Sequence, residues 1–348
     1  MATNEGPAAA AEARGKLGRM VFGTMAAQVV ATAARFGLMD RIGDGERTAA
    51  ELAEECDADP QAMHRLLRAL AGLELLTEHQ PGTFSATAVG ALLVTDRPDS
   101  FHSFVRMFTD PAMLRAWDHL EDSVRTGRPA FADVFGTDFF GYLKQNPELS
   151  AQFNGAMSQG TRATAIAVPA RYDFGRFSTV VDVGGGDGTL LAAILREHPA
   201  LRGVLFDTAE GLAGAAETFR REGVGERCES VTGDFFRSVA PGGDLYLLKS
   251  VIHDWDDERA ATILRHCRAA LPGHGRVLLI EPVLPPVVDP ATASLTYLSD
   301  LNMLVNLGGR ERTRADFEDL CGRAGLTVTA VEPLPPPNAF SLIEAAPV

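Results

Sequence analysis

The sequence predicts an α/β fold in two domains, a mainly helical domain over residues 1–165 and a parallel sheet covered by helices over residues 166–348. Its 348 residues exceed what one hydrophobic core usually organises. Apolar residues recur at helical spacing through the first half. Beyond Tyr172, short apolar runs alternate with helical segments, which is typical of a parallel sheet with helices on both faces.

A winged-helix pattern occupies the start of the helical domain. A helix with a broad apolar face is predicted over Leu17–Phe36. Thr48, with Glu51 three residues later, predicts a capped short helix, and a second helix is predicted over Gln61–Leu73. A hairpin is predicted over Leu76–Ala86, so that two helices and a hairpin together indicate a winged helix.

Charge favours one of two interpretations of this winged helix. The second helix offers only Arg65 and Arg68, and the chain carries a formal net charge of −14. Because Lys and Arg neutralise phosphates in nucleic-acid binding, a scaffold or dimerisation role is favoured over DNA binding. A cofactor-sensing regulator that binds DNA is the less favoured alternative. Neither nucleic acid nor a membrane is expected as a partner.

Cysteine spacing and the N-terminus give two further expectations. The four cysteines are isolated and form no C-x-x-C pair, so neither a disulfide framework nor a metal site is predicted. Residues 1–15 lack the charged start and apolar stretch of a signal peptide. No run approaches the ~20 apolar residues of a membrane span, and a cytoplasmic protein is expected.

The segment Phe101–Ser158 is helical in pattern and rich in aromatic residues and methionines. Most of these side chains are expected in the core. A minority are candidates for lining a pocket for a flat ligand, since such pockets consist mainly of apolar and aromatic side chains. These candidates are Phe104, Met107, Trp117, Phe153 and Met157.

The second half alternates between predicted strands and helices. The predicted strands cover residues 178–183, 203–206, 229–231, 244–251 and 275–280, and the intervening helices cover 189–197, 211–221 and 258–271. After a helix over Arg314–Ala324, two strand-like pieces are expected to pair antiparallel at one edge of the sheet. These pieces are Leu326–Val331 and Phe340–Ala345.

A glycine-rich turn follows the first predicted strand and leads directly into a helix. It reads DVGGGDG over residues 182–188. The turn fails the dinucleotide fingerprint because Thr189 occupies the third glycine position, and no P-loop sequence is present. A nicotinamide oxidoreductase is therefore a disfavoured alternative. Open parallel sheets bind ligands at the carboxyl ends of their strands, so a ligand is expected at this turn.

Acidic residues follow successive predicted strands around this turn. Asp182 lies in the turn, and Asp207 lies where a carboxylate would accept hydrogen bonds from ribose hydroxyls. At the third strand end, Asp234 offers an acceptor for an exocyclic amine beside the aromatic face of Phe235. These acidic side chains lie at a predicted nucleoside site that lacks a phosphate-binding motif. The sequence therefore predicts a nucleoside ligand that is cationic and carries no phosphate.

Four segments carry a resemblance that covers nearly the whole chain. In these segments the chain resembles the S-adenosylmethionine-dependent small-molecule O-methyltransferases, which include caffeate-type plant enzymes and bacterial enzymes that tailor polyketides and antibiotics. The segments are DVGGGDG at 182–188, GDFF at 233–236, LKSVIHDWDD at 248–257 and GGRERT at 308–313. The resemblance implies a Rossmann-like class I methyltransferase domain and an N-terminal winged-helix dimerisation domain.

The resemblance also implies ligands, partners and residue roles. S-adenosylmethionine is the expected methyl donor, with S-adenosylhomocysteine as product and no metal; the expected acceptor is a small aromatic or polycyclic hydroxylated molecule. A homodimer is expected. By this resemblance, the methionyl part is approached by Gly184, Gly186 and Gly188, the ribose and adenine by Asp207, Asp234 and Phe235, and the pocket is completed by Ser158, Lys249 and Ser250.

The chemistry requires a base near the acceptor oxygen. A phenol of pKa about 10 is only about one part in a thousand ionised at neutral pH. Ionising it at that pH costs roughly 4 kcal/mol of free energy, which a general base can offset. Of the eight histidines, only His253 follows a strand at the cofactor edge, so we predict it to be the general base. Glu281 and Glu311 match the family's flanking acids, and the resemblance implies an assisting role for Asp254.

A helix over residues 300–306 is predicted to wall the acceptor pocket. Met303 offers an apolar surface, Asn306 offers a hydrogen-bonding group, and Asn302 is a further polar candidate. Methyl transfer to a hydroxyl is the favoured function. The alternative is a relative that binds S-adenosylmethionine but catalyses another reaction, such as hydroxylation.

Overall fold

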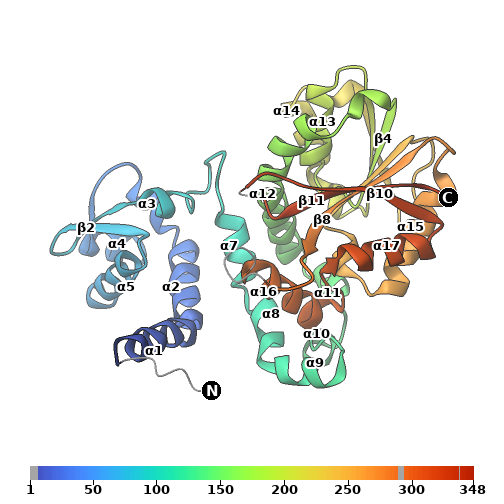
Figure 1. Cartoon of the computed structure of the whole chain (residues 1–348). Coiled ribbons are helices and arrows are strands. Elements are labelled where there is room, and N and C mark those ends of the chain that lie inside the picture. Colours follow the sequence, from blue (N-terminus) through green and yellow to red (C-terminus); the bar gives the residue numbers. More distant parts are fainter. Residues whose placement is uncertain (1–6, 289–293, 337) are drawn as a thin grey trace. The chain divides into compact units, whose positions relative to one another are not determined.

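The protein is described by a computed structural model over residues 7–288, 294–336 and 338–348 (Figure 1). The chain forms two compact units, Met1–Asp110 and Pro111–Val348. The sequence prediction set the domain boundary after residue 165, whereas these units divide after Asp110. The helices between the two positions belong to the unit that contains the large sheet.

The N-terminal unit begins with two helices where one was predicted over Leu17–Phe36. α1 (Pro7–Val21) and α2 (Gly23–Arg35) meet at a bend of 45°. Glycine is a poor helix former, and Gly23 lies at this break. In the described chain no single helix is long and apolar enough to cross a membrane, although α1 and α2 together reach that length and composition. The exposed apolar side chains here are Leu17, Met20, Val21, Phe22 and Met25.

The rest of this unit contains the predicted winged helix. Its elements are α3 (Leu38–Ile42), β1 (Arg47–Thr48), α4 (Ala49–Glu55), α5 (Pro60–Gly72), β2 (Leu76–Gln80), β3 (Thr83–Ala86), α6 (Ala88–Ala91) and α7 (His102–Phe108). Thr48 and Glu51 form the predicted capping box at the start of α4. The strands pair antiparallel in the order β1-β3-β2, which confirms the predicted hairpin.

The second unit opens with a run of helices. They are α8 (Pro111–Leu114), η1 (Arg115–His119), α9 (Leu120–Thr126), α10 (Phe131–Phe135), α11 (Phe139–Gln145) and α12 (Pro147–Arg171). The longest of them, α12, packs along α13 (Thr189–Glu197), the helix that follows the glycine-rich turn. The predicted helical character of residues 101–158 is thus confirmed.

Beyond Tyr172 the predicted mixed sheet is present. Five strands pair in parallel: β4 (Thr179–Val183), β5 (Arg202–Asp207), β6 (Cys228–Thr232), β7 (Leu245–Lys249) and β8 (Arg276–Leu284). The order is β10-β11-β8-β7-β4-β5-β6, with β10 (Leu326–Pro333) and β11 (Phe340–Pro347) as the predicted antiparallel edge. Strand order reverses at β4, and ligands bind at the carboxyl end of such a position.

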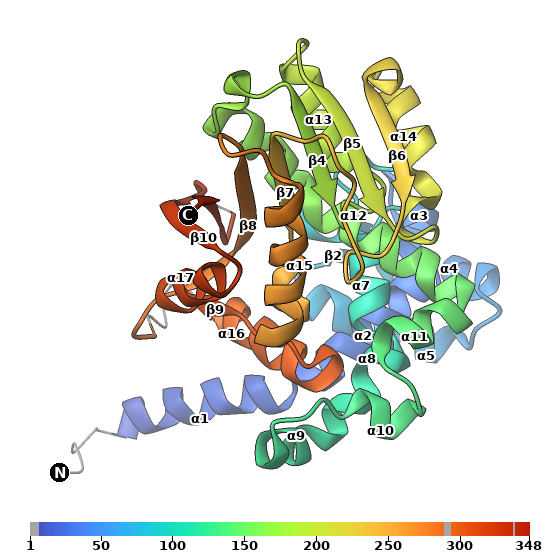
Figure 2. The ribbon, with the colours of Figure 1, turned by 90° about the vertical axis from the view of Figure 1, so that its right-hand side faces the viewer.

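Helices cover both faces of this sheet (Figures 1 and 2). α12, α13 and α14 (Ala215–Arg221) pack on one face, and α15 (Asp257–Ala270) and α17 (Arg314–Arg323) pack on the other. Side chains of β7 alternate between the two cores because successive strand residues point to opposite faces. Leu245 and Leu247 lie in the hydrophobic core between the sheet and α12, α13 and α14. Tyr246 and Leu248 lie in the core between the sheet and α15 and α17.

The predicted helix over residues 300–306 spans two elements. α16 (Ser294–Asn302) continues into η6 (Met303–Leu307), one turn of π-helix. Such turns occur frequently at functional sites. β9 (Arg312–Thr313) then pairs in parallel with the end of β8, a short strand that the sequence did not predict.

Candidate active site

The glycine-rich turn at the end of β4 has the tight geometry that its sequence predicted. Gly184, Gly186 and Gly188 all adopt left-handed φ angles, of 72°, 60° and 75°. A Cβ on Gly188 would lie 2.6 Å from the ring of Phe219, and one on Gly184 would lie 2.8 Å from Val251 Cγ2. Positions 184 and 188 require glycine because side chains disfavour such φ angles and would clash, whereas at Gly186 the φ angle alone favours glycine.

Asp207 ties this turn to the end of β5. Its Oδ2 accepts a hydrogen bond from the backbone N–H of Gly186 at 2.8 Å, and its Oδ1 accepts one from Thr208 at 2.6 Å. Burial raises the pKa of Asp207, and these two bonds oppose that rise. The structure therefore brings Asp207 and the glycine turn together at one edge, as predicted.

Asp182 lies buried beneath the turn. A Cβ on Gly185 would approach its carboxyl group at 2.6 Å. Burial and the neighbouring Asp207 raise the pKa of Asp182 to about 8, while Lys249 opposes the rise. Its Oδ2 has no hydrogen-bond partner among the described residues. A buried carboxylate without a partner is unfavourable, so a cationic ligand nearby would stabilise it.

Lys249 and Ser158 join α12 to the same edge. Lys249 Nζ donates to Thr161 Oγ1 at 3.2 Å and lies 4.8 Å from the ring centroid of Phe340. Burial lowers the pKa of Lys249 to about 8. Ser158 Oγ lies 3.1 Å from Thr189 Oγ1, at the start of α13, and Ser250 adopts a left-handed φ of 53°.

Asp234 and Phe235 lie in the loop that follows β6. The Phe235 ring is within 3.7 Å of the position that a Cβ on Gly184 would occupy. Asp234 Oδ1 accepts a hydrogen bond from the Phe236 backbone, and the ring of His266 donates from Nδ1 to the Phe235 carbonyl at 2.8 Å. This loop is thus held beside the glycine turn.

His253 lies on η5 (Ile252–Asp254), directly after β7. Its Nδ1 is 3.0 Å from Glu311 Oε1 and 3.8 Å from Glu281 Oε2. Since a carboxylate only accepts hydrogen bonds, Nδ1 carries the proton, and in a neutral ring Nε2 is then the available base. Asp254 Oδ1 lies 3.5 Å from this Nε2. The four predicted catalytic residues therefore form one cluster.

Electrostatics within this cluster favour a proton on His253. Burial lowers its pKa, but Glu281, Glu311 and Asp254 outweigh burial and raise the pKa to about 10. Burial, with Glu281 and Glu311, raises the pKa of Asp254 to about 7, against the opposing effect of His253. Burial also raises the pKa of Glu281. His253 must therefore lose a proton before it accepts one.

Glu281 and Arg312 fix the position of η5. Glu281 Oε1 accepts the backbone N–H groups of Val251 and Ile252 at 3.0 and 2.8 Å. The fully buried Arg312 donates to the carbonyls of Ile252 and Trp255, at 2.9 Å each, and to Asp257 at 2.8 Å. Both ends of the turn that carries His253 are thus hydrogen-bonded to buried charged groups.

One nitrogen and two carboxylate oxygens of His253, Glu281 and Glu311 lie within 4.8 Å of one another, a spacing that a metal ion could bridge. The sequence predicted no metal. The 3.0 Å separation of His253 Nδ1 and Glu311 Oε1 is a hydrogen-bond distance, which fits a shared proton between them. Ser299 Oγ donates to the same oxygen at 3.0 Å.

The predicted acceptor-pocket residues divide between the two units. Trp117, Asn302 and Asn306 are joined by hydrogen bonds, and the buried Met303 lies between the two asparagines in sequence. Ring contacts run from Phe153 through Phe140 and Trp255 to Phe235. The backbone oxygen of Met157 accepts the Thr161 hydroxyl. Phe104 and Met107 lie on α7 in the N-terminal unit.

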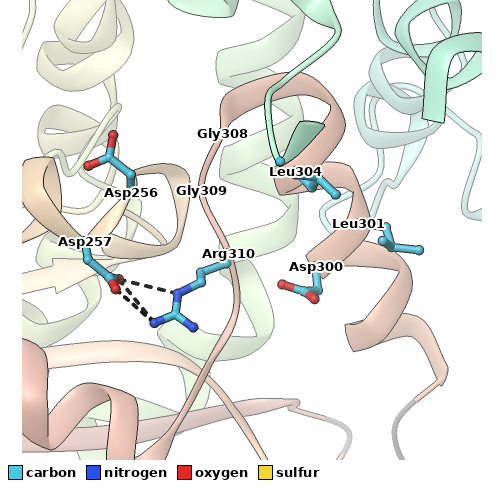
Figure 3. Close-up of a pocket in the computed structure, with 9 residues that line it drawn as sticks. Asp256, Asp257, Asp300, Leu301, Leu304, Gly308, Gly309 and Arg310 are labelled. Carbon is cyan, nitrogen blue, oxygen red and sulfur yellow. Dashed lines mark hydrogen bonds and ion pairs between the residues drawn. The ribbon is translucent and has the colours of Figure 1, made fainter. Parts of the chain in front are cut away.

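A separate pocket of about 340 Å³ lies beside the GGRERT segment (Figure 3). Among the residues that line it are Asp257, Asp300 and Arg310. Arg310 pairs with Asp257 at 3.0 Å, and Asp300 accepts the backbone N–H of Glu311 at 2.8 Å. These charged groups already have partners, and none of the predicted site residues lines this pocket.

Several residues that hold the site together were not predicted from the sequence. Thr161, His266 and Ser299 each bond to a predicted site residue or its backbone, but nothing in their sequence surroundings indicated this. Gly185 and Arg312 lay inside quoted motifs without an assigned role. Only the fold reveals that Gly185 covers Asp182 and that Arg312 is buried.

Comparison with known proteins defines the class to which this fold and site belong. Residues 117–327 match the O-methyltransferase domain, and residues 19–96 match the O-methyltransferase dimerisation domain. The chain belongs to the O-methyltransferase family. The predicted class and its two-part architecture are therefore confirmed.

The chain is similar along most of its length to individual known proteins. The chain is 51% identical to O-demethylpuromycin-O-methyltransferase of Streptomyces alboniger, over 94% of this chain and 88% of the relative. It is similar to the crystal structure of LaPhzM, with 40% identity and a TM-score of 0.91 over 96% of this chain and 99% of the other. It also resembles NcsB1 of neocarzinostatin biosynthesis, solved with S-adenosylmethionine and 2-hydroxy-5-methyl naphthoic acid, at 34% identity and TM-score 0.79 over 92% and 96% of the two chains.

Proposed function

We propose that this enzyme transfers a methyl group from S-adenosylmethionine to a phenolic hydroxyl of a small aromatic secondary metabolite, with His253 as general base. The observation that carries the proposal is the meeting of two features at the strand ends. An acid-lined glycine turn follows β4, and a histidine held by Glu311 follows the neighbouring β7.

The strand-end residues fit the proposed cofactor by charge and shape. Asp182 has a buried oxygen without a hydrogen-bond partner in the described part of the chain, and burial together with Asp207, at the end of the neighbouring strand β5, raises its pKa. The glycine turn and Lys249 would hold the methionyl part, Asp207 the ribose, and Asp234 with Phe235 the adenine. S-adenosylmethionine would supply, when bound, a methyl group on a positively charged sulfur, and the acceptor oxygen would bond to the methyl carbon as the carbon–sulfur bond breaks and the neutral thioether leaves.

The cluster around His253 supplies the proton transfer in this proposal. Glu311 holds Nδ1, so the neutral imidazole offers Nε2 to the acceptor hydroxyl. The imidazolium that forms is stabilised by Glu281 and Glu311, which are both buried. Positive charge at the adjoining cofactor site favours the initial loss of a proton from His253.

Similar proteins support the proposed class of acceptor and the proposed homodimer. By name, the Streptomyces alboniger relative methylates O-demethylpuromycin, and NcsB1 was solved with a hydroxylated naphthoic acid. We propose an aromatic hydroxylated acceptor here as well. We also propose a homodimer, supported by the dimerisation-domain match and by the exposed apolar side chains of α1 and α2.

The pH dependence of methyl transfer tests the base. We expect kcat/KM for a phenol to rise with pH in the wild-type enzyme, because His253 becomes active when it loses its proton. Glu311 raises the pKa of His253, so Glu311→Gln should move this rising limb to lower pH. The measurement is transfer of a labelled methyl group from S-adenosylmethionine across the neutral and alkaline range.

Glu318→Gln, which removes an exposed carboxylate from α17, is the matched control and should leave the profile unchanged. A rising limb that stays in place or moves to higher pH in Glu311→Gln would rule out this role for the pair. Cofactor binding without label transfer to any phenol would instead support a non-methylating reaction.

A further inference from the structure

The segment from Gly309 to Glu311 lies directly against η5, the turn that carries His253. The Arg310 backbone N–H donates to the His253 carbonyl at 2.9 Å. The next residue, Glu311, binds the ring of the same histidine at Nδ1, at 3.0 Å. One short segment therefore holds His253 at two points, its backbone carbonyl and its ring.

Gly309 permits this close contact because it has no side chain. A Cβ on Gly309 would lie 2.0 Å from the His253 carbonyl oxygen and 2.4 Å from the Asp254 carbonyl carbon. Both are backbone atoms, which cannot turn aside as the end of a flexible side chain can. Gly309 is buried and its φ angle is not left-handed, so the close approach of the two backbones is what requires glycine here.

Arg312 secures the same contact further along the segment. Its buried guanidinium donates to the carbonyls of Ile252 and Trp255, which lie before and after His253. It also pairs with Asp257, at the start of α15, at 2.8 Å. A planar fork of donors can serve several acceptors at once, which the single ammonium of a lysine does less well. The contacts of this segment thus fix the backbone before, at and after the histidine.

The position of a general base leaves little tolerance. Such a base acts within hydrogen-bond reach of the hydroxyl, about 2.6–3.2 Å. A side chain at position 309 would force the two backbones apart by about 1 Å, and a misplacement of this size can cost about 10²-fold in rate. Because Glu311 follows two residues later, the same displacement would draw its carboxylate away from the His253 ring.

We propose that Gly309 and Arg312 are positioning residues for methyl transfer: they hold the segment 309–312 against η5, and this contact keeps His253 Nε2 directed at the acceptor hydroxyl. This inference rests on the proposed function, in which His253 is the base. Both residues act through His253 and Glu311, and neither needs to contact the acceptor.

Gly309→Ala tests this placement. We expect kcat for a phenol to fall about 10- to 100-fold, because the added Cβ displaces the base and its carboxylate together. The affinity for S-adenosylhomocysteine, measured by calorimetry, should change little. Gly273→Ala is the matched control, since Gly273 is exposed and its added Cβ would meet nothing within 4 Å. This control should keep wild-type kcat.

The titration of the His253 ring, followed by NMR, gives a readout that does not depend on turnover. In the described part of the chain, the carboxylates of Asp254, Glu281 and Glu311 lie within 4 Å of this ring. Burial lowers the pKa of His253, and these carboxylates outweigh burial and raise it to about 10. Gly309→Ala moves Glu311 away, so the pKa of His253 should fall and the rising limb of kcat/KM should move to lower pH.

Arg312→Lys is the second variant, for the case that Gly309→Ala does not fold. Lysine keeps the positive charge but not the fork of donors, so kcat and the pKa of His253 should fall in the same direction by a smaller amount. Wild-type kcat and an unchanged His253 titration in either variant would overturn the role of that residue. A reduced kcat with an unchanged titration would overturn the positioning role, because the loss would then arise elsewhere. Methyl transfer to no phenol by the wild-type enzyme would overturn the proposed function together with this inference.

Discussion

Replacing His253 with alanine should lower kcat for a phenolic acceptor by about 10²-fold or more, because the acceptor hydroxyl then lacks a positioned base. The affinity for S-adenosylhomocysteine should change little. His253 is hydrogen-bonded to Glu311 rather than to the glycine turn, so the substitution removes no hydrogen bond that holds that turn. Label-transfer kinetics and calorimetry measure the two quantities separately.

His274→Ala is the matched control, since this histidine is exposed in the loop before β8 and lies outside the proposed site. It should retain wild-type turnover. Near-normal turnover in His253→Ala would mean that proximity alone, or an already ionised acceptor, accounts for the reaction. Raising the pH should partly rescue His253→Ala, because a larger fraction of the phenol is then ionised.

Asp207→Ala should weaken the binding of S-adenosylhomocysteine by about 10- to 100-fold. The substitution removes the proposed ribose acceptor, and hydrogen bonds to charged groups contribute about 1.5–3 kcal/mol each. It also removes the acceptor of the hydrogen bond from the Gly186 N–H, which holds the glycine turn against β5. At saturating cofactor, turnover should fall much less than affinity, because Asp207 lies at the ribose end of the proposed site.

Asp207→Asn keeps one carbonyl oxygen and should lose less affinity than the alanine variant. Glu229→Ala removes an exposed acid from the neighbouring strand β6 and serves as the control for net charge. Unchanged affinity in Asp207→Ala, measured by calorimetry, would place the nucleoside elsewhere. An equal loss in Glu229→Ala would show that only overall charge matters.

The sequence predicted the fold where local signals are strong. The turn at 182–188 follows a buried strand and precedes a helix, so its place at the sheet edge followed from the pattern. The Thr48 capping box and the antiparallel edge strands were predicted for the same reason. The break at Phe22 was missed, because an apolar periodicity does not reveal where a glycine interrupts a helix.

The sequence was sufficient to predict which strand ends form the site, but not which side chains contact one another there. The contact of His253 with Glu311 joins residues 58 positions apart, and no local pattern fixes which acid holds the ring. The same limit applies to Trp117 and Asn302, which lie 185 positions apart. These contacts depend on how η1, η5 and η6 pack, and packing is a property of the folded chain.

A crystal structure with S-adenosylhomocysteine bound is the most direct test of how the strand ends work together. We expect the ribose on Asp207, the adenine beside Asp234 and Phe235, and the sulfur turned toward the Nε2 edge of His253. A nucleoside bound at another edge of the sheet, or a sulfur facing away from His253, would contradict this expectation.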